Sequence, residues 1–244
     1  MSAEGLAALA AEVHDCRRCP RLVQWRELVA HEKRAAFRDE TYWGRPIDGF
    51  GDPAARALIL GLAPAAHGAN RTGRVFTGDR SGDFLFAALH RTGFANQPVS
   101  RRRDDGLALR DCWITAAVRC APPANKPLPA ERDNCATWLH AELQLLEHAR
   151  VVVCLGAFAW EAGWKQLAPG VRPRPRFGHA AEARAGAYTM LGCFHPSQQN
   201  TFTGKLTPAM IDAVLEQART LAAQPPSETA ATPSARSALS TSAT

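Results

Sequence analysis

Length, composition and charge set the first limits on this chain. It has 244 residues, 46% of them hydrophobic, which is enough for one sizeable globular core. Its 29 Lys and Arg exceed its 23 Asp and Glu, and the net charge of +6 favours a polyanionic partner without requiring one. No apolar run reaches the roughly 18 residues of a membrane span, and the N-terminal residues lack a signal-peptide pattern, so we expect a cytoplasmic protein with no membrane partner.

Predicted helices and strands alternate along the chain. Helices are expected at residues 4–14, 20–37, 83–92, 129–148, 158–166 and 207–222, and apolar strands at residues 57–61, 112–118, 150–156 and 188–194. This alternation predicts a mostly parallel sheet with helices on both faces. From residue 224 the composition changes to Pro, Ser, Thr and Ala without an apolar period. We therefore expect one domain over residues 1–223 and a disordered tail over residues 224–244.

The seven cysteines fall into two groups. Three lie inside apolar strands, where a small buried hydrophobe is expected, namely Cys112, Cys154 and Cys193. The others form a C-x2-C pair and a second, wider pair: Cys16 with Cys19, and Cys120 with Cys135. Such spacing suits a structural zinc site, an iron-sulfur cluster or a redox dithiol. The redox alternative is disfavoured because the C-x2-C pair precedes every predicted strand, but spacing leaves zinc and iron-sulfur both open.

Three of the predicted strands end in polar loops, over residues 62–83, 119–127 and 195–201. Because parallel strands end at the same edge of a sheet, these loops are expected to meet in one site. The glycines of the first loop allow backbone to approach a ligand closely. Residues 68–75 superficially resemble a phosphate-binding P-loop, but Arg74-Val75 stands where Lys-Ser or Lys-Thr is needed, which disfavours nucleotide hydrolysis.

His195 and Asp79 are the candidates for chemistry in these loops. The proline after His195 favours extended backbone at the strand end, which would aim the ring into the cleft. The alternative is a structural histidine that bonds a nearby carbonyl. Asp79 has a simpler alternative as a helix N-cap, but we expect Asp83 to be the better cap or first-turn acid, and the second candidate for catalysis.

Other side chains of the first loop suit contacts with a nucleic acid. Arg71 and Arg74 lie among glycines at a strand end and fit contacts with phosphodiesters, although solvated charges are the simpler interpretation. Phe76 is either a loop anchor that packs on the core or a ring that stacks on a base.

Taken together, the motifs resemble family 5, the type-B enzymes, of the uracil-DNA glycosylase superfamily over residues 16–222. The resemblance rests on the four spaced cysteines and on Gly61-Leu62-Ala63-Pro64, Phe76-Thr77-Gly78-Asp79, Thr115-Ala116-Ala117-Val118-Arg119-Cys120 and His195-Pro196-Ser197. It implies a three-layer αβα sandwich around a short, mainly four-stranded parallel sheet. It also implies a monomer with a [4Fe-4S] cluster, held by Cys16, Cys19, Cys120 and Cys135.

The resemblance further implies a hydrolase of base-excision DNA repair, which flips a damaged nucleotide out of DNA and cleaves its N-glycosidic bond to leave an abasic site. His195 would donate a hydrogen bond to a carbonyl oxygen of the leaving base, while Asp79 would stabilise the sugar cation and orient or deprotonate water. No lysine occupies these motifs, so a monofunctional enzyme is expected. Substrate contacts are expected from Gly61, Ala63, Pro64, His67, Gly68, Asn70, Arg71, Arg74, Phe76, Ala116, Ser197 and Asn200.

Two departures from related families shape the expected activity. Residues 62–65 lack the polar side chain that positions water in relatives, so the catalytic carboxylate must come from elsewhere, and Asp79 is the best candidate. Ala116 stands where some relatives carry an asparagine that reads the pyrimidine edge. Without that buried hydrogen-bonding filter, we expect release of uracil and also of hypoxanthine, xanthine or hydroxymethyluracil. The alternatives are a more uracil-restricted glycosylase, a nonenzymatic iron-sulfur DNA-binding protein and a zinc-bound hydrolase of small molecules.

Overall fold

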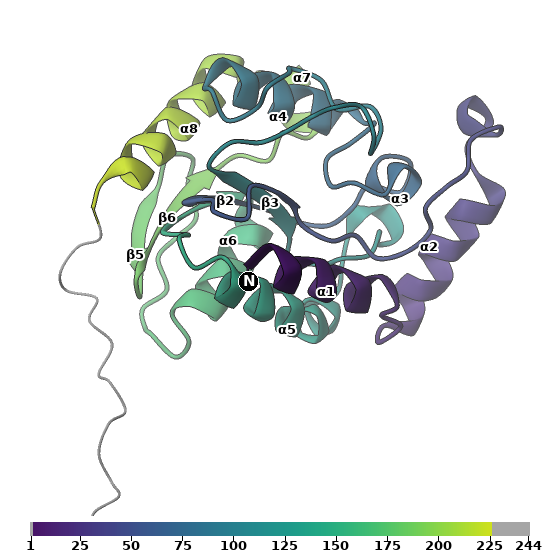
Figure 1. Cartoon of the computed structure of the whole chain (residues 1–244), viewed down its shortest axis with the longest axis horizontal. Coiled ribbons are helices and arrows are strands. Elements are labelled where there is room, and N and C mark those ends of the chain that lie inside the picture. Colours follow the sequence, from purple (N-terminus) through teal and green to yellow (C-terminus); the bar gives the residue numbers. More distant parts are fainter. Residues whose placement is uncertain (1, 226–244) are drawn as a thin grey trace, which may run out of the picture.

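The computed structural model describes residues 2–225, and a six-stranded sheet runs through their centre (Figure 1). The strands are β1 (Phe50–Gly51), β2 (Ala57–Gly61), β3 (Cys112–Ala116), β4 (Val151–Leu155), β5 (Glu182–Ala185) and β6 (Tyr188–Cys193). They lie in the order β1-β3-β2-β4-β6-β5. The inner four strands are parallel, and the two edge strands, β1 and β5, pair antiparallel with their neighbours. The parallel register brings the carboxyl ends of β2, β3, β4 and β6 to one edge.

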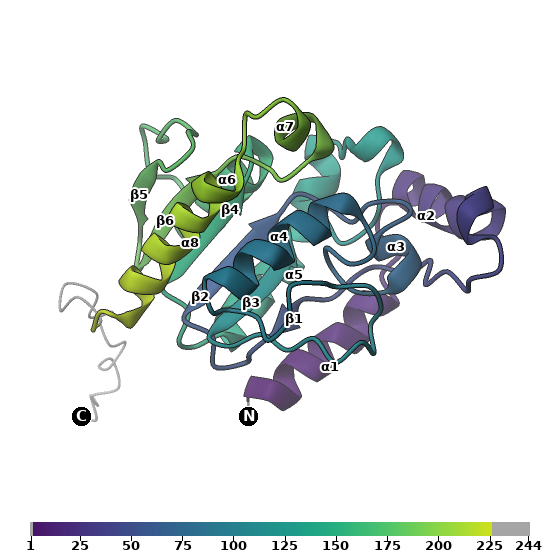
Figure 2. The same cartoon turned by 90° about the horizontal axis from the view of Figure 1, so that it is seen from above.

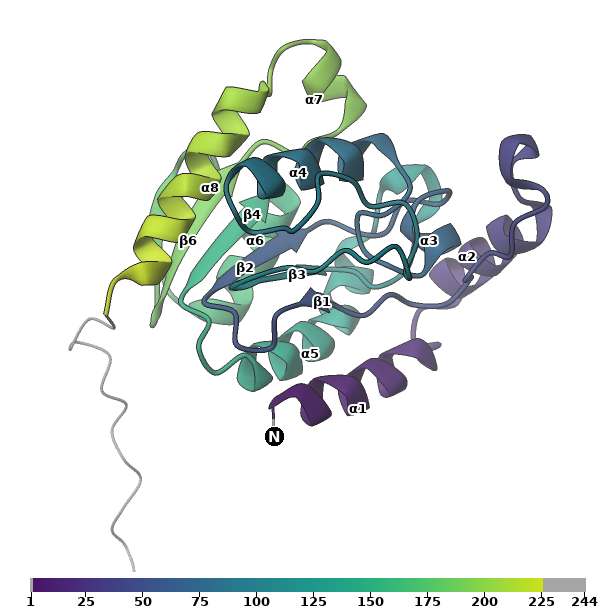
Figure 3. The ribbon, with the colours of Figure 1, turned by 45° about the horizontal axis from the view of Figure 1, so that its top comes forward.

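Helices cover both faces of this sheet. The α-helices of the described residues are α1 (Ser2–His14), α2 (Pro20–Glu32), α3 (Ala69–Thr72), α4 (Arg80–Arg91), α5 (Pro129–Leu145), α6 (Ala157–Leu167), α7 (Gln198–Phe202) and α8 (Pro208–Ala223), and five of them cover the sheet. Helices α4 and α8 pack on one face, whereas α1, α5 and α6 lie on the other (Figures 2 and 3). Because successive strand residues point to opposite faces, Ile59 enters the first core while Leu58 and Leu60 enter the second. Covering both faces explains why the inner strands read as continuous apolar runs.

The three-layer αβα arrangement and the four parallel strands predicted from the sequence are confirmed. The sequence did not indicate β1 and β5, which are short and only partly buried. The second helix is shorter than predicted: α2 ends at Glu32, and a separate 3-10 turn spans Ala35–Phe37, because Lys33 has a φ of +57° that interrupts the helix. Within residues 2–225, no helix has both the length and the hydropathy that crossing a membrane requires.

Two short helices, α3 and α7, lie inside the polar loops that were predicted as irregular. Figure 2 shows α3 beside α2, and α7 beyond the start of α8. At the other end of the chain, α8 ends at Ala223. Apart from residues 224 and 225, the predicted disordered tail lies outside the described residues.

Candidate active site

A cavity of about 550 Å³ opens at the carboxyl ends of the parallel strands. As predicted, it is formed where the loops after β2, β3 and β6 meet. Its walls come from Leu62, Ala63, Pro64, Ala65, Val75, Phe76, Asp79, Arg80, Ser81, Asn125, His195, Ser197, Gln198 and Gln199. Two titratable groups with perturbed pKa values, a half-buried aromatic ring and several amides therefore face one concave space, the arrangement expected of an active site.

Asp79 faces this cavity and also begins helix α4. Its Oδ1 accepts a hydrogen bond from the backbone N–H of Gly82 at 2.9 Å, so Asp79 is the N-cap of that helix. Asp83 was expected to be the better cap or a first-turn acid: the structure bears out the first-turn position, while the cap is Asp79. Burial raises the pKa of Asp79, although the N–H groups of Gly82 and Ser81 act in the opposite direction. The helix start thus fixes the position of a carboxylate that has lost part of its hydration.

Gly68 sets the other side of the Asp79 carboxylate. A Cβ placed on Gly68 would lie 2.9 Å from Asp79 Cγ and closer still to Oδ2. Gly68 therefore has to be glycine for the carboxylate to occupy this position. The glycines of this loop were expected to let the backbone approach a ligand; the group that lies against Gly68 in the structure is the protein's own carboxylate.

His195 lies two residues after the end of β6 and lines the same cavity. Burial lowers the pKa of His195 to about 4, so its imidazole is neutral at neutral pH and offers one N–H donor. The side chain of Asn200 donates a hydrogen bond to the backbone carbonyl of His195 at 2.9 Å, which fixes the turn after the strand. Asn200 does not line the cavity itself and acts through His195.

Phe76 presents a fixed ring to the cavity. Its backbone has a φ of +51°, and its carbonyl lies so close to Gly82 that any side chain there would overlap it. The ring packs against Gly61, where an added Cβ would lie 2.7 Å from Cε2. The ring centroids of Phe76 and His195 are 6.1 Å apart. Phe76 is thus anchored against the end of β2 while it still lines the cavity, so both roles considered from the sequence are compatible.

The structure corrects the role expected for Arg71 and Arg74. Neither lines the cavity, and both side chains are buried. Arg71 donates to the carbonyls of His67 and Gly78 at 2.8 and 2.9 Å and pairs with Glu40. A guanidinium engaged in this way has no free edge for a phosphate. Arg71 instead connects the start of the loop to the residue before Asp79.

Other predicted contact residues divide between the cavity wall and its support. Ala63, Pro64 and Ser197 line the cavity. His67 lies outside the lining, with its Nδ1 3.0 Å from the hydroxyl of Tyr42. Three further residues are buried behind the wall and do not line it: Gly61, Asn70 and Ala116. Asn70 donates to the carbonyl of Arg26 at 3.2 Å, so it joins α3 to α2.

Sequence reasoning did not single out Asn125, Gln198 and Gln199 as site residues. All three line the cavity and bring amide donors and acceptors to it. Asn125 has a φ of +55°, a conformation that asparagine tolerates better than most residues. Its place in the polar segment after β3 was the available signal.

The four cysteines outside the strands, Cys16, Cys19, Cys120 and Cys135, lie together near the end of α1 and the start of α2. Cys19, Cys120 and Cys135 belong to one buried apolar cluster, and Cys16 packs against it. An Arg26 N–H donates to Cys120 Sγ at 3.0 Å, and the Asn134 amide lies 3.6 Å from Cys19 Sγ. Burial raises the pKa of Cys120 to about 12 and that of Cys135 to about 11. Within residues 2–225, no group of three or more His, Cys, Asp or Glu side chains is placed to hold a metal ion.

Comparison with known proteins decides the family. The model of the uracil DNA glycosylase superfamily matches residues 49–219. A type-5 uracil-DNA glycosylase of Mycobacterium tuberculosis (strain CDC 1551 / Oshkosh) is 56% identical to this chain, over 90% of this chain and 83% of that protein. The chain belongs to the type-5 family of the uracil-DNA glycosylase superfamily. A type-5 relative of Thermus thermophilus is 52% identical over 85% of this chain and 94% of the relative. A type-5 relative of Pyrobaculum aerophilum is 45% identical over 84% of this chain and 88% of the relative.

The family assignment confirms the resemblance inferred from the motifs. The matched region begins just before β1 and ends within α8, so it includes the whole sheet and every residue that lines the cavity. It leaves out Cys16 and Cys19, although the similarity to the type-5 relatives extends over a longer part of the chain.

Proposed function

We propose that this protein removes uracil from DNA by hydrolysing the N-glycosidic bond and leaves an abasic site. The observation that carries the proposal is the cavity in which a partly buried carboxyl group, Asp79, and a neutral imidazole, His195, face the same space beside the Phe76 ring. Such a cavity suits a nucleotide that has been flipped out of the duplex, because only then can its glycosidic bond reach buried side chains. The type-5 relatives are named uracil-DNA glycosylases.

The two side chains match the two charges of the transition state. As the bond between C1′ and the base nitrogen breaks, its electron pair moves to the base and the sugar becomes cation-like. The neutral imidazole of His195 donates a hydrogen bond to a carbonyl oxygen of the departing base, where negative charge accumulates. Ionised Asp79 stabilises the sugar cation and accepts a proton from the water that attacks C1′. The released base anion then takes a proton from solvent, which completes the hydrolysis.

We infer that the reaction is monofunctional. A glycosylase that also cleaves the strand uses an amine to form a Schiff base with the sugar. Among the described residues that line the cavity, none is a lysine. Water activated by Asp79 is therefore the nucleophile we assign.

We propose a substrate range wider than uracil. Residues 62–65 give the cavity an apolar wall, and Ala116, at the end of β3, brings only a buried methyl group behind it. An apolar wall does not reject a base for lacking a particular hydrogen-bond partner, since no buried polar group is left unpaired. Hypoxanthine, xanthine and hydroxymethyluracil are the further bases we expect to be released.

We infer that Cys16, Cys19, Cys120 and Cys135 hold a [4Fe-4S] cluster. They come from three separate segments into one cluster, and an Arg26 N–H and the Asn134 amide lie at the sulfurs of Cys120 and Cys19, where they would hydrogen-bond to ligating sulfur. When bound, the cluster would supply a cross-link between the start of α2, the segment after β3 and α5. Purification without oxygen should give brown protein with absorption near about 400 nm, whereas colourless protein containing zinc would contradict this assignment.

One assay tests the proposed activity and its range together. Oligonucleotides that each carry one candidate base are incubated with the protein, and abasic sites are then cleaved with alkali. Cleavage is expected at uracil and also at hypoxanthine, xanthine and hydroxymethyluracil. Release of uracil alone would contradict the wider range, and DNA binding without any release would identify a nonenzymatic DNA-binding protein.

We further infer that residues 1–223 act as one domain, as a monomer, in the cytoplasm.

A further inference from the structure

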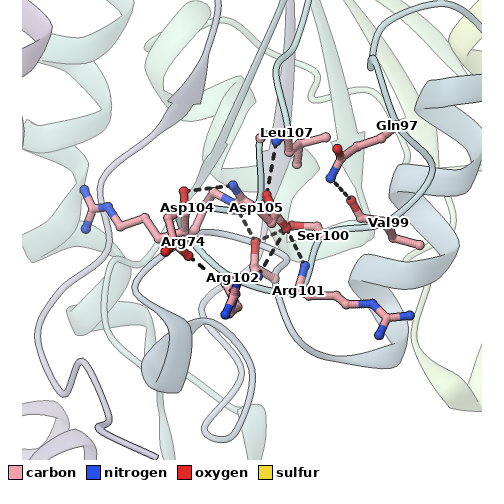
Figure 4. A network of polar contacts seen from close by, with 12 residues as sticks. Arg74, Gln97, Val99, Ser100, Arg101, Arg102, Asp104, Asp105 and Leu107 are labelled. Carbon is pink, nitrogen blue, oxygen red and sulfur yellow. Dashed lines mark hydrogen bonds and ion pairs between the residues drawn. The ribbon is translucent and has the colours of Figure 1, made fainter.

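The segment between α4 and β3 carries a compact arginine loop, residues 100–105, on the surface. Arg101, Arg102 and Arg103 are consecutive and exposed. The guanidinium of Arg101 extends away from the polar network beneath it (Figure 4). Arg102 lies 3.5 Å from Asp104, but both side chains are more than 70% exposed, so this pair holds Arg102 only weakly. Arg103 lies 3.5 Å from Asp48 and donates to the carbonyl of Gly73 at 3.3 Å, so the two charges of Arg101 and Arg102 remain available on this turn.

Asp105 holds this turn in a defined shape. Its carboxylate accepts backbone N–H groups from Arg101 at 2.7 Å, Arg102 at 3.2 Å and Leu107 at 3.1 Å. Arg74 donates to the same carboxylate at 2.8 Å from below (Figure 4). Burial alone would raise the pKa of Asp105, but these donors outweigh it and lower that pKa. The exposed arginines thus stand on a preorganised base, which reduces the conformational entropy lost on binding.

The same network joins the arginine loop to the segment that carries Asp79. Arg74 also donates to Thr77 Oγ1 at 3.0 Å and to Ser100 Oγ at 2.7 Å. The N–H of Gly78, one residue before Asp79, donates to the carbonyl of Ser100 at 3.0 Å. The loop is therefore bonded to the segment that leads into Asp79 in the cavity wall, so we expect a DNA strand that enters the cavity to pass close to it.

We propose that Arg101 and Arg102 bind phosphates of the DNA strand beside the cavity. The inference rests on the proposed function, which makes DNA the substrate, and assigns part of the surface that holds it. Arginine side chains on an ordered turn fit phosphodiester oxygens well, and such contacts add affinity without reading sequence. The buried Arg74 supports this surface and does not contact the strand.

The test is the salt dependence of binding to an undamaged duplex, followed by fluorescence anisotropy between 50 and 200 mM salt. Each phosphate contact contributes about 0.9 to the slope of log affinity against log salt, so Arg101→Ala and Arg102→Ala should each lower the slope by about 0.9. The advantage of the unmodified protein over each variant should shrink about 3.5-fold across that salt range. Arg101→Lys should keep most of the slope, because it keeps the charge.

Arg110→Ala is the matched control. Arg110 is also exposed, but it lies two residues before the start of β3 and so at the opposite end of the sheet from the cavity. Arg110→Ala removes the same unit of charge and should leave the slope of log affinity against log salt unchanged. Equal slopes for all three alanine variants, with unchanged melting temperatures, would overturn the proposal. Because this readout needs no base release, a failure of the glycosylase assay would be recognised separately.

Discussion

Replacing Gly68 with alanine should slow uracil release by displacing the carboxylate of Asp79. The added Cβ would lie 2.9 Å from Asp79 Cγ, whereas ordinary contacts begin at 3.4 Å, and the overlap with Oδ2 is larger. The carboxylate cannot simply rotate away, because Oδ1 is bonded to the N–H of Gly82 at 2.9 Å. Either that cap bond breaks or the loop after β2 moves.

The size of the effect follows from this displacement. A shift of about 1 Å in a positioned catalytic group costs about 100-fold in rate, so the single-turnover rate should fall by about that factor. Breaking the cap would in addition cost about 1 kcal/mol of folding free energy. For a chain of this size, that corresponds to a melting temperature lower by about 2–4 °C.

The assay is single-turnover release of uracil from a labelled oligonucleotide with enzyme in excess. A double-mutant cycle separates the carboxylate from any backbone strain: in an Asp79→Ala background, Gly68→Ala should slow the residual rate by less than about twofold. Gly178→Ala is the control, because its Cβ would make only an ordinary contact, 3.6 Å from Ala181. A normal rate for Gly68→Ala, or an equal loss in both backgrounds, would refute the reasoning.

Three further predictions test other parts of the site. Because catalysis needs ionised Asp79 and the pKa of Asp79 is raised, the single-turnover rate should fall as the pH drops through a value above the ordinary aspartate range. His195, with a pKa of about 4, adds no change in rate near neutrality. A pH-rate profile whose only acid limb lies near pH 4 would contradict this prediction. Cys135→Ala should abolish the absorption near about 400 nm, whereas Cys154→Ala, in β4, should retain it. Visible spectra of the two variants test this prediction. Arg71→Lys should lower the single-turnover rate about tenfold through a lost charged hydrogen bond, whereas a phosphate-binding role would tolerate lysine and leave the rate intact.

The inner sheet could be predicted from sequence because each parallel strand is buried on both faces. Five consecutive apolar residues such as Ala57–Gly61 have few other interpretations when glycine and polar residues follow. The edge strands carry no such signal: β1 has only two residues, and β5 is largely exposed. Their pairing depends on neighbours that are distant in sequence.

The candidate site was predictable in its chemistry but less so in its supporting contacts. Asp79 and His195 could be identified because acids and histidines at strand ends are few. Which of two acids begins α4 is decided by backbone geometry around Phe76 and Gly82, which no local pattern reveals. Likewise, Arg71 looks like a surface charge among glycines until Glu40 and the carbonyl of Gly78 are placed beside it.

The most direct test of the account compares the unmodified protein with Asp79→Asn on one duplex that contains a single uracil. The two differ by one ionisable group of almost unchanged size, and the asparagine can still cap α4. The unmodified protein should leave an alkali-labile abasic site at the uracil, and the variant should bind the duplex normally while releasing the base at least about 100-fold more slowly. Near-normal release by Asp79→Asn would contradict the role assigned to this carboxylate, and no release by the unmodified protein would contradict the proposed function itself.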